Sequence, residues 1–205
     1  MTQVLVVVIA YLLGSIPFAY LAGRTRGIDI RTVGSKNVGA SNVFRELGKG
    51  MGITVMALDI AKGLIAVLIA DAQTASPWPL VAAAAAILGH VFPVWLHFKG
   101  GKGVAVAGGA MIGLAPLPAI IVLVLWGIIV GVTRYVSVGS ITAAAVFPFL
   151  VLAFGAPWPT VVFAFLASIM VIVRHRSNIR RLRHGEEHRL DFRRMRGTPE
   201  PGADR

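Results

Sequence analysis

The stretch GHVFPVWLHFKGGKG, residues 89–103, decides both the fold and the candidate site of this chain. Long apolar runs flank it, yet its last six residues place Lys99 and Lys102 among three glycines. Glycine lets a ligand approach the backbone closely and lets successive N–H groups face one concavity. Lysines add positive charge at the same place. The stretch therefore predicts a binding loop for a phosphate, or alternatively a tight cytoplasmic turn whose lysines only mark one side of a membrane.

The loop differs from a nucleotide-hydrolysing P-loop at one position. In the P-loop motif a Ser or Thr that holds magnesium follows the lysine, whereas Gly103 follows Lys102 here. We therefore expect an anion-binding loop that holds no magnesium.

The composition of the chain is that of a membrane protein. Of its 205 residues, 56% are hydrophobic and only 14% are charged. A soluble domain of this size cannot bury so much apolar surface, so the lipid bilayer is the expected solvent. The basic residues behind the net charge of +11 fall in loops and in the tail, which favours contact with anionic lipid and not with nucleic acid. The chain has no cysteine, which excludes disulfides, thiolate metal sites and a cysteine nucleophile.

Apolar runs separated by polar or proline-rich turns predict an all-α integral membrane protein, a polytopic helical bundle. The runs cover residues 4–22, 51–70, 80–96, 104–114, 119–132, 138–154 and 160–173. The run 104–114 makes only about 16 Å of helix, which is too short to cross the hydrocarbon core. Counting every run predicts about seven spans, and merging the short ones predicts about five.

Loops of two kinds alternate along the chain. Basic residues lie in 23–50, 97–103, 133–137 and the tail, whereas 71–79, 115–118 and 154–159 contain no basic residue. By the positive-inside rule the basic loops are cytoplasmic, with the N-terminus outside and the C-terminus in the cytoplasm. We expect a single transmembrane domain over residues 1–188 and a basic, weakly ordered cytoplasmic tail over 189–205.

The loop that begins at residue 34 offers a second set of polar groups on the same side. It contains hydroxyl, amide and guanidinium groups beside glycines, which suits the binding of a phosphate and neighbouring hydroxyls. The alternative is a polar loop with a helix cap at Ser41 or Asn42. The candidate residues are Gly34, Ser35, Asn37, Gly39, Asn42 and Arg45.

Two further polar clusters lie at the predicted cytoplasmic ends of later spans. One runs from Arg134 to Ser137 with Ser140 nearby, and in the other His175 and Asn178 are three apart and share a helix face. The alternative for both is a set of snorkelling basic residues at span ends. Asp59 and Lys62 lie inside the second span, where unpaired charge is expensive. We expect them to pair with each other or with partners on other helices, either to brace the bundle or to contact the substrate.

Taken in order, these motifs resemble those of one bacterial membrane enzyme family, the acyl-phosphate:glycerol-3-phosphate acyltransferases of the PlsY type. The resemblance extends from about residue 14 to residue 186, and its motifs are GSKNVGASN (34–42), GHVFP (89–93), FKGGKGV (98–104) and RHRSN (174–178). Val38 stands where proline is common in the family, and Ser41 stands where threonine is common. Both departures are conservative for a loop.

The resemblance implies the first acylation of phospholipid synthesis, in the bacterial inner membrane with the active site on the cytoplasmic face. A fatty acyl phosphate would donate its acyl group to the 1-hydroxyl of sn-glycerol 3-phosphate, giving lysophosphatidic acid and phosphate. The acyl phosphate is already activated, so neither a covalent acyl-enzyme nor a cofactor is expected. The partners implied are the two substrates, membrane lipids and the enzyme that forms the acyl phosphate.

Carried over by position, the family motifs assign roles to particular residues. Ser35, Arg45, Lys102 and the Gly100–Gly101 backbone would hold the acyl phosphate's phosphoryl group, where positive charge stabilises the leaving group. Lys99, His175, Asn178 and Ser140 would bind glycerol 3-phosphate. His90 would orient a phosphate or act as a base, although the family is thought to let a substrate phosphate accept the proton. The loop residues Gly34, Asn37, Gly39, Asn42 and Gly103 complete the expected substrate-binding set.

Other function classes are less consistent with the sequence. Acyl-CoA and acyl-carrier acyltransferases use an HxxxxD motif, but no acidic residue stands five positions after any of the five histidines. A transporter for a phosphorylated metabolite would need a polar path and an outer vestibule, whereas the predicted outer loops are short and apolar. A structural membrane protein would explain the basic tail but not the glycine-lysine stretch.

Overall fold

The computed structural model describes residues 1–190, and within that range the chain forms helices joined by turns and loops, with no strand. Ten α-helices and one 3-10 helix follow one another along the chain. They are α1 (Thr2–Ser15), α2 (Phe18–Arg24), α3 (Ala40–Leu47), α4 (Lys49–Gln73), α5 (Trp78–Val91), η1 (Val94–Leu96), α6 (Val104–Leu114), α7 (Pro116–Thr133), α8 (Val136–Ala153), α9 (Trp158–Arg174) and α10 (Arg176–Arg183).

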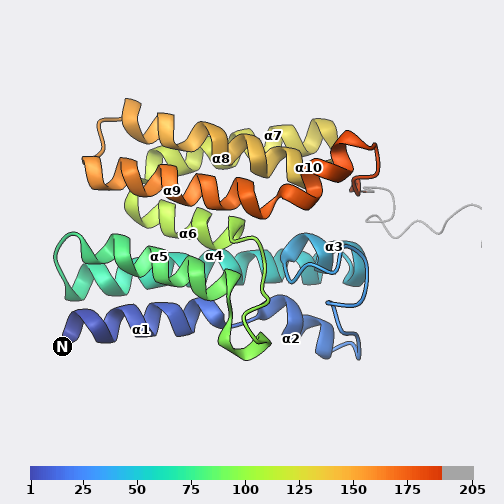
Figure 1. Ribbon diagram of the computed structural model, residues 1–205, viewed down its shortest axis with the longest axis horizontal. Helices are drawn as coiled ribbons and strands as arrows, with labels where there is room; N and C mark the ends of the chain where they lie inside the picture. Colours follow the sequence, from blue (N-terminus) through green and yellow to red (C-terminus); the bar gives the residue numbers. More distant parts are fainter. Residues whose placement is uncertain (191–205) are drawn as a thin grey trace, which may run out of the picture.

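The long helices run back and forth along one axis, so that loops of the same kind gather at the same end (Figure 1). The turns α4–α5 and α8–α9 lie at the end that carries the N-terminus. The segment from α2 to α3, the glycine-rich stretch before α6, the α7–α8 turn and α10 lie at the opposite end. The basic loops that the sequence analysis assigned to one face therefore do share one end of the bundle, which we call the polar end.

Five helical segments are long and apolar enough to cross a membrane, and a sixth is added if α9 and α10, which meet at a bend of 52°, count as one span. The short helix α6 is also apolar, but its 11 residues are too few to cross the hydrocarbon core. The predicted first span, 4–22, falls within one of these segments, Thr2–Arg24, which contains a short break between the end of α1 at Ser15 and the start of α2 at Phe18. Pro17 lies in this break, where it lacks the N–H that a continuous helix would need.

The predicted loop 23–50 is also only partly a loop, because α3 occupies its second half. Arg189 and Leu190, which we placed in the weakly ordered tail, contact the α7–α8 turn. The Leu190 N–H donates to the Arg134 carbonyl at 2.8 Å, and Leu190 is only 7% exposed. The rest of the predicted tail, 191–205, lies outside the described residues.

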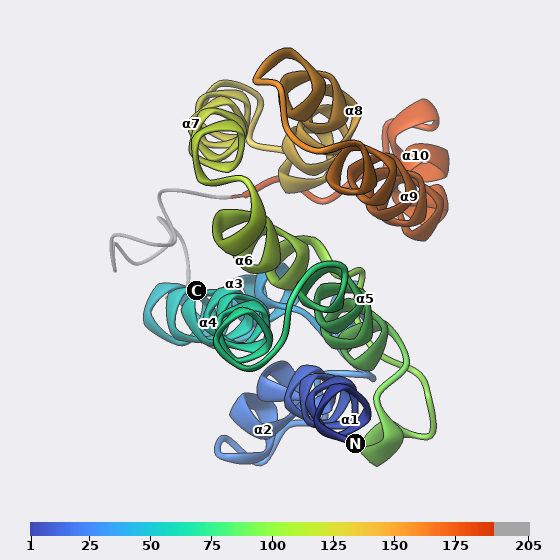
Figure 2. The same cartoon turned by 90° about the vertical axis from the view of Figure 1, so that its left-hand side faces the viewer.

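The bundle divides into two groups of helices (Figure 2). The N-terminal group is α1 to α6, in which α1 packs on α5 and α4 packs on both α5 and α6. The C-terminal group is α7 to α10, in which α8 packs between α7 and α9. Glycines let the N-terminal helices touch backbone to backbone: a side chain at Gly14, Gly63 or Gly109 would collide with the main chain of Ala86, Val106 or Ile60 respectively. The candidate site lies between the two groups.

Candidate active site

One cavity of about 220 Å³ runs from the polar end into the space between the two helix groups. Its polar part, which we call the chamber, is lined by Ser35, Asn37, Arg45, His90, Lys102, Ser137, Ser140, His175, Asn178, Glu187 and His188. Its apolar part, which we call the groove, is lined mainly by α4, α6, α7 and α8, through Met56, Ile60, Ala105, Ala107, Gly108, Met111, Ile112, Ala119, Val122, Leu123, Trp126, Ala143, Ala144 and Phe147. Gly108 and Leu123 are exposed, so the groove reaches the surface between α6 and α7.

Ser35 and Arg45 meet in the chamber, as the sequence predicted. Arg45 lies on the last turn of α3, and its Nη2 donates a hydrogen bond to the Ser35 hydroxyl oxygen, with an N–O distance of 3.1 Å. The loop that carries Ser35 is fixed by Asn42, whose Oδ1 accepts from the Ser35 N–H at 2.9 Å. The Asn42 amide also donates to the Ile30 and Val33 carbonyls, each at 3.1 Å.

Two residues of this loop shape the site and do not line it. Asn42 is fully buried, and its amide is used by the backbone, so the structure places it behind the chamber. Gly34 has a φ of +55°, and a side chain there would collide with Asn42 and Glu46. Gly34 and Asn42, which we expected to contact substrate, therefore do not line the cavity, and they set the conformation of the loop. Asn37 and Gly39 do line the cavity.

The glycine-rich stretch, residues 98–103, departs most from expectation, because its backbone N–H groups were expected to bind a phosphate. The N–H groups of Gly100 and Gly101 donate to the Val91 and His90 carbonyls at the end of α5, each at 3.1 Å, so they are not available to a phosphate. Neither glycine lines the chamber, and nor does Gly103, which caps α6 with a φ of +84°. These glycines instead allow the stretch to lie flat against α5, because a side chain at Gly100 would collide with the His90 carbonyl.

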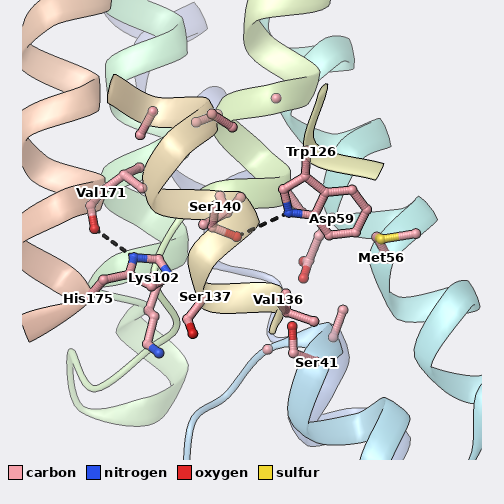
Figure 3. A pocket seen from close by; sticks show the side chains of 18 of the residues that line it. Ser41, Met56, Asp59, Lys102, Trp126, Val136, Ser137, Ser140, Val171 and His175 are labelled. Carbon is pink, nitrogen blue, oxygen red and sulfur yellow. Dashed lines mark hydrogen bonds between the residues drawn. The ribbon is translucent and has the colours of Figure 1, made fainter. Parts of the chain in front are cut away.

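The two lysines of the stretch lie in different places. Lys102 projects into the chamber (Figure 3), whereas Lys99 is exposed and does not line the cavity. The expected contact between Lys99 and glycerol 3-phosphate therefore has no support in this geometry. Lys102 precedes the first turn of α6, whose residues Val104 and Ala105 also line the cavity. The open N–H groups and the dipole of a helix N-terminus favour an anion there, in place of the N–H groups of the glycines.

Lys102, Asn178 and Glu187 form a connected polar network across the chamber. The Lys102 ammonium donates to the Asn178 carbonyl oxygen. The Glu187 carboxylate accepts from Asn178 at 2.6 Å, from Ser137 at 2.8 Å and from Arg181 at 2.8 Å. Burial alone would raise the pKa of the Glu187 carboxyl, but these hydrogen bonds and the Arg181 charge hold it below its ordinary value. Burial lowers the pKa of Lys102 to about 8.

Ser140 and His175 face the chamber from the C-terminal group (Figure 3). The indole N–H of Trp126 donates to the Ser140 hydroxyl at 3.2 Å. Because that hydroxyl accepts from Trp126, its own proton is free for a ligand. The His175 Nδ1 lies 2.8 Å from the Val171 carbonyl, which can only accept, so Nδ1 carries the proton and Nε2 is left as an acceptor.

His90 lies on the other side of the chamber, beside a buried ion pair. Lys62 and Asp59 of α4 pair at 2.8 Å, each with only 2% of its side chain exposed, which confirms the ion pair predicted within this span. No acidic residue stands near His90 along the chain. In three dimensions Asp59 lies 3.6 Å from the His90 Nδ1.

Sequence reasoning missed Glu187, His188 and Trp126, which line the cavity, and it missed the approach of Asp59 to His90. Glu187 stands among basic residues near the C-terminus, and an acidic residue in such a sequence is expected to be solvated at the surface. Trp126 stands in the middle of an apolar run, where an aromatic residue is expected to face the lipid. Within residues 1–190 no group of three or more His, Cys, Asp and Glu side chains is placed to hold a metal ion.

The fold is a bundle of membrane-length helices, and its cavity joins a cationic chamber to an apolar groove. These features define a polytopic membrane protein with an amphiphilic cavity. The glycerol-3-phosphate acyltransferase family model matches residues 4–185 of this chain. The chain therefore belongs to the glycerol-3-phosphate acyltransferase family, and the resemblance drawn from its motifs is confirmed.

Relatives and solved structures agree with this assignment. The chain is 48% identical over 187 residues to glycerol-3-phosphate acyltransferase 2 of Moorella thermoacetica, covering 91% of this chain and 96% of that protein. It is 45% identical over 191 residues to the glycerol-3-phosphate acyltransferase of Geobacter sulfurreducens, covering 93% of this chain and 98% of that protein. The fold matches the crystal structure of PlsY, an integral membrane glycerol 3-phosphate acyltransferase, in its glycerol 3-phosphate form, with a TM-score of 0.92, 40% identity and coverage of 97% of this chain and 100% of that one. The lysophosphatidic acid form of PlsY matches with a TM-score of 0.87, 39% identity and the same coverage.

Proposed function

We propose that this protein transfers a fatty acyl group from an acyl phosphate to the 1-hydroxyl of sn-glycerol 3-phosphate, giving lysophosphatidic acid and inorganic phosphate. The observation that carries the proposal is the continuity of the cationic chamber with the apolar groove. An acyl phosphate has an anionic head and one long apolar chain, and so does the product. The proposal is supported by family membership and by the glycerol 3-phosphate and lysophosphatidic acid forms in which the related PlsY was crystallised.

In this proposal the phosphoryl group of the donor lies between Ser35, Arg45 and Lys102. The Ser35 hydroxyl and the Arg45 guanidinium already contact each other at 3.1 Å, and Lys102 faces them from the start of α6. Positive charge at this place favours the phosphate as a leaving group, because charge develops there as the anhydride bond breaks. The acyl chain extends from this point into the groove.

Glycerol 3-phosphate occupies the other side of the chamber, against Ser140, His175 and Asn178. Ser140 donates a hydrogen bond, because its oxygen already accepts from Trp126. His175 accepts at Nε2, because its Nδ1 donates to the Val171 carbonyl. A hydroxyl of the acceptor substrate other than the attacking one donates to Nε2, which orients the substrate for attack.

The chemical step needs no covalent acyl-enzyme. The acceptor hydroxyl oxygen forms a bond to the acyl carbonyl carbon, the bond from that carbon to the phosphate oxygen breaks, and the phosphate leaves with the electron pair. The hydroxyl proton passes to a substrate phosphate oxygen, so that the products are the acylated glycerol 3-phosphate and inorganic phosphate. Lys102 and Arg45 stabilise the negative charge throughout.

The same proposal places the protein in the bacterial inner membrane with the polar end in the cytoplasm and the N-terminus outside. The concentration of arginine and lysine at the polar end supports this orientation under the positive-inside rule. Glycerol 3-phosphate is a charged, water-soluble metabolite and would enter from that side. The enzyme that forms the acyl phosphate would deliver its amphiphilic product to the same face.

A donor comparison tests this function. Purified protein in lipid nanodiscs receives labelled glycerol 3-phosphate with palmitoyl phosphate in one tube and palmitoyl-CoA in another. We expect labelled lysophosphatidic acid from the acyl phosphate alone. Product from acyl-CoA at a similar rate would overturn the assignment of the donor. No product from either donor, in folded protein that binds glycerol 3-phosphate, would overturn acyl transfer itself and favour transport.

A further inference from the structure

The buried Lys62 ammonium has three close neighbours, and they come from three parts of the chain. Its Nζ lies 2.8 Å from the Asp59 Oδ1 on α4, 2.8 Å from the Ile16 carbonyl in the break between α1 and α2, and 3.1 Å from the Nδ1 of His90 on α5. The Lys62 side chain is 2% exposed, so water does not compete for these contacts.

These contacts decide which ring nitrogen of His90 carries the proton. A lysine ammonium has three donors and no acceptor. The Ile16 carbonyl accepts one of these protons, and the Asp59 carboxylate pairs with the ammonium charge. At the Lys62–His90 contact the ammonium can only donate, so His90 Nδ1 must accept. A neutral imidazole that accepts at Nδ1 carries its proton on Nε2. The competing contact from Nδ1 to the Asp59 carboxylate is 3.6 Å, too long for a hydrogen bond.

We propose that Lys62 is a positioning residue that fixes His90 as the neutral Nε2–H tautomer, so that His90 acts in the chamber as a hydrogen-bond donor and not as a base. The inference rests on the proposed function for the reaction that His90 serves. It replaces the alternative, left open by the sequence, that His90 removes the proton from the acceptor hydroxyl.

The ring that Lys62 orients lies against the glycine stretch. The space where a side chain of Gly101 would extend is filled by the His90 Nε2, and the Gly101 N–H donates to the His90 main-chain carbonyl at 3.1 Å. The stretch is thus held by both the ring and the main chain of His90, and the next residue along it is Lys102. The Arg174 guanidinium holds the same glycine from the other side, donating to its carbonyl at 3.1 Å.

His175 shows the opposite arrangement in the same cavity. Its Nδ1 faces a carbonyl, which requires a proton on Nδ1, whereas the His90 Nδ1 faces an ammonium, which forbids one. Among the histidines that line the cavity, His90 therefore donates at Nε2 and His175 accepts at Nε2. The acceptor faces the proposed position of glycerol 3-phosphate.

The first test reads the tautomer directly, without substrate, and so does not depend on the acyl-transfer assay. Histidine labelled with ¹⁵N is incorporated into the full chain in detergent micelles, and long-range ¹H–¹⁵N spectra give the protonation of each ring. His90→Gln identifies the His90 signals. We expect a protonated Nε2 and an unprotonated Nδ1 at pH 7. A His90 ring protonated at Nδ1, alone or together with Nε2, would overturn the proposal.

The second test separates a donor from a base. Glutamine places an amide N–H donor near the position of Nε2 but cannot take up a proton, and leucine does neither. General-base catalysis contributes about 100-fold or more, so a base role requires His90→Gln and His90→Leu to lose activity equally. We expect His90→Gln to stay within about tenfold of the wild type and His90→Leu to lose about 100-fold. Equal losses would contradict the donor role. His97→Gln, at an exposed position outside the cavity, is the matched control.

The third test concerns Lys62 itself. Lys62→Met removes the ammonium that faces His90 Nδ1, and we expect the His90 ring to move its proton to Nδ1, facing Asp59. A folded Lys62→Met protein that keeps the Nε2–H signal unchanged would show that Lys62 does not set the tautomer. If this variant does not fold, the wild-type spectrum and the glutamine–leucine comparison still decide the question.

Discussion

The chamber and the groove are two parts of one cavity, and they differ in how their lining residues are held. Most polar side chains of the chamber contact another side chain: Arg45 contacts Ser35, Lys102 contacts Asn178, and Ser140 contacts Trp126 at the border with the groove. In the groove the lining is apolar, and it opens at the surface between α6 and α7. A head group that must be oriented for attack needs fixed partners, whereas a chain that enters from the bilayer needs only an apolar opening.

Two adjacent glycines on α6 show the same contrast at the level of single residues. Gly109 faces α4, where a side chain would collide with the Ile60 main chain. Gly108 lines the groove, and a side chain there would meet nothing within 4 Å. Gly109 is thus required for helix packing, and Gly108 keeps the groove open. The residue type alone does not reveal which of the two roles applies.

The largest effect is expected from breaking the charge of the chamber. Lys102→Ala removes the ammonium that faces the leaving phosphate, and we expect acyl transfer to fall by about 100-fold to 1,000-fold. Lys99→Ala, three residues earlier in the same stretch, removes an exposed lysine and should leave the rate within about twofold of the wild type. Steady-state kinetics with palmitoyl phosphate measures both. Equal losses in the two variants would mean that the glycine stretch binds phosphate in another way.

A smaller effect is expected from filling the groove. Gly108→Phe places a ring in the open space, and misplacing the acyl carbonyl should lower kcat/KM for palmitoyl phosphate by about 100-fold or less. A short-chain donor such as butyryl phosphate should be affected much less. Gly131→Phe is the matched control, because Gly131 on α7 is also open but does not line the cavity. Similar losses for both chain lengths would argue that the chain does not enter the groove.

The pH dependence sharpens the role of Lys102. Burial lowers the pKa of Lys102 to about 8, so the amine is charged below that pH and loses its charge above it. We expect kcat/KM to be high near pH 7 and to fall by about tenfold per pH unit well above pH 8. Lys102→Arg keeps its charge and should move this decline to higher pH, even if its absolute rate is lower. A decline that stays in place in Lys102→Arg would belong to another group.

The smallest effect is expected from loosening one hydrogen bond in the chamber. Trp126→Phe keeps the ring and removes the N–H that donates to Ser140, which should raise the KM for glycerol 3-phosphate by about threefold to tenfold. In a Ser140→Ala background the same change should add nothing, because the partner is gone. Trp158→Phe, at an exposed position, is the control. Additive losses in the double variant would show that Trp126 acts independently of Ser140.

The features that could be predicted from the sequence are those that depend on local pattern. Hydropathy and charge predicted the apolar helices and the gathering of the basic loops at one end, and the motif residues Ser35, Arg45 and Lys102 do line the same chamber. What the sequence could not give depends on contacts between distant segments. The Gly100 and Gly101 N–H groups are used by α5, and only the close approach of the stretch to α5 reveals that. Likewise, Asp59 reaches His90 and Glu187 reaches Ser137 across long separations in the chain.

The most direct test of the account is to find where the acyl chain lies. A palmitoyl phosphate analogue with a photoreactive diazirine at the far end of its chain is bound to the protein in nanodiscs, activated by light, and mapped by mass spectrometry. The account predicts labels on the groove-lining faces of α6, α7 and α8, around Met111, Ala119 and Phe147, and their loss when unlabelled palmitoyl phosphate is added. Labels confined to lipid-facing residues such as Leu5, Val8 and Leu12 of α1, unaffected by competitor, would contradict it.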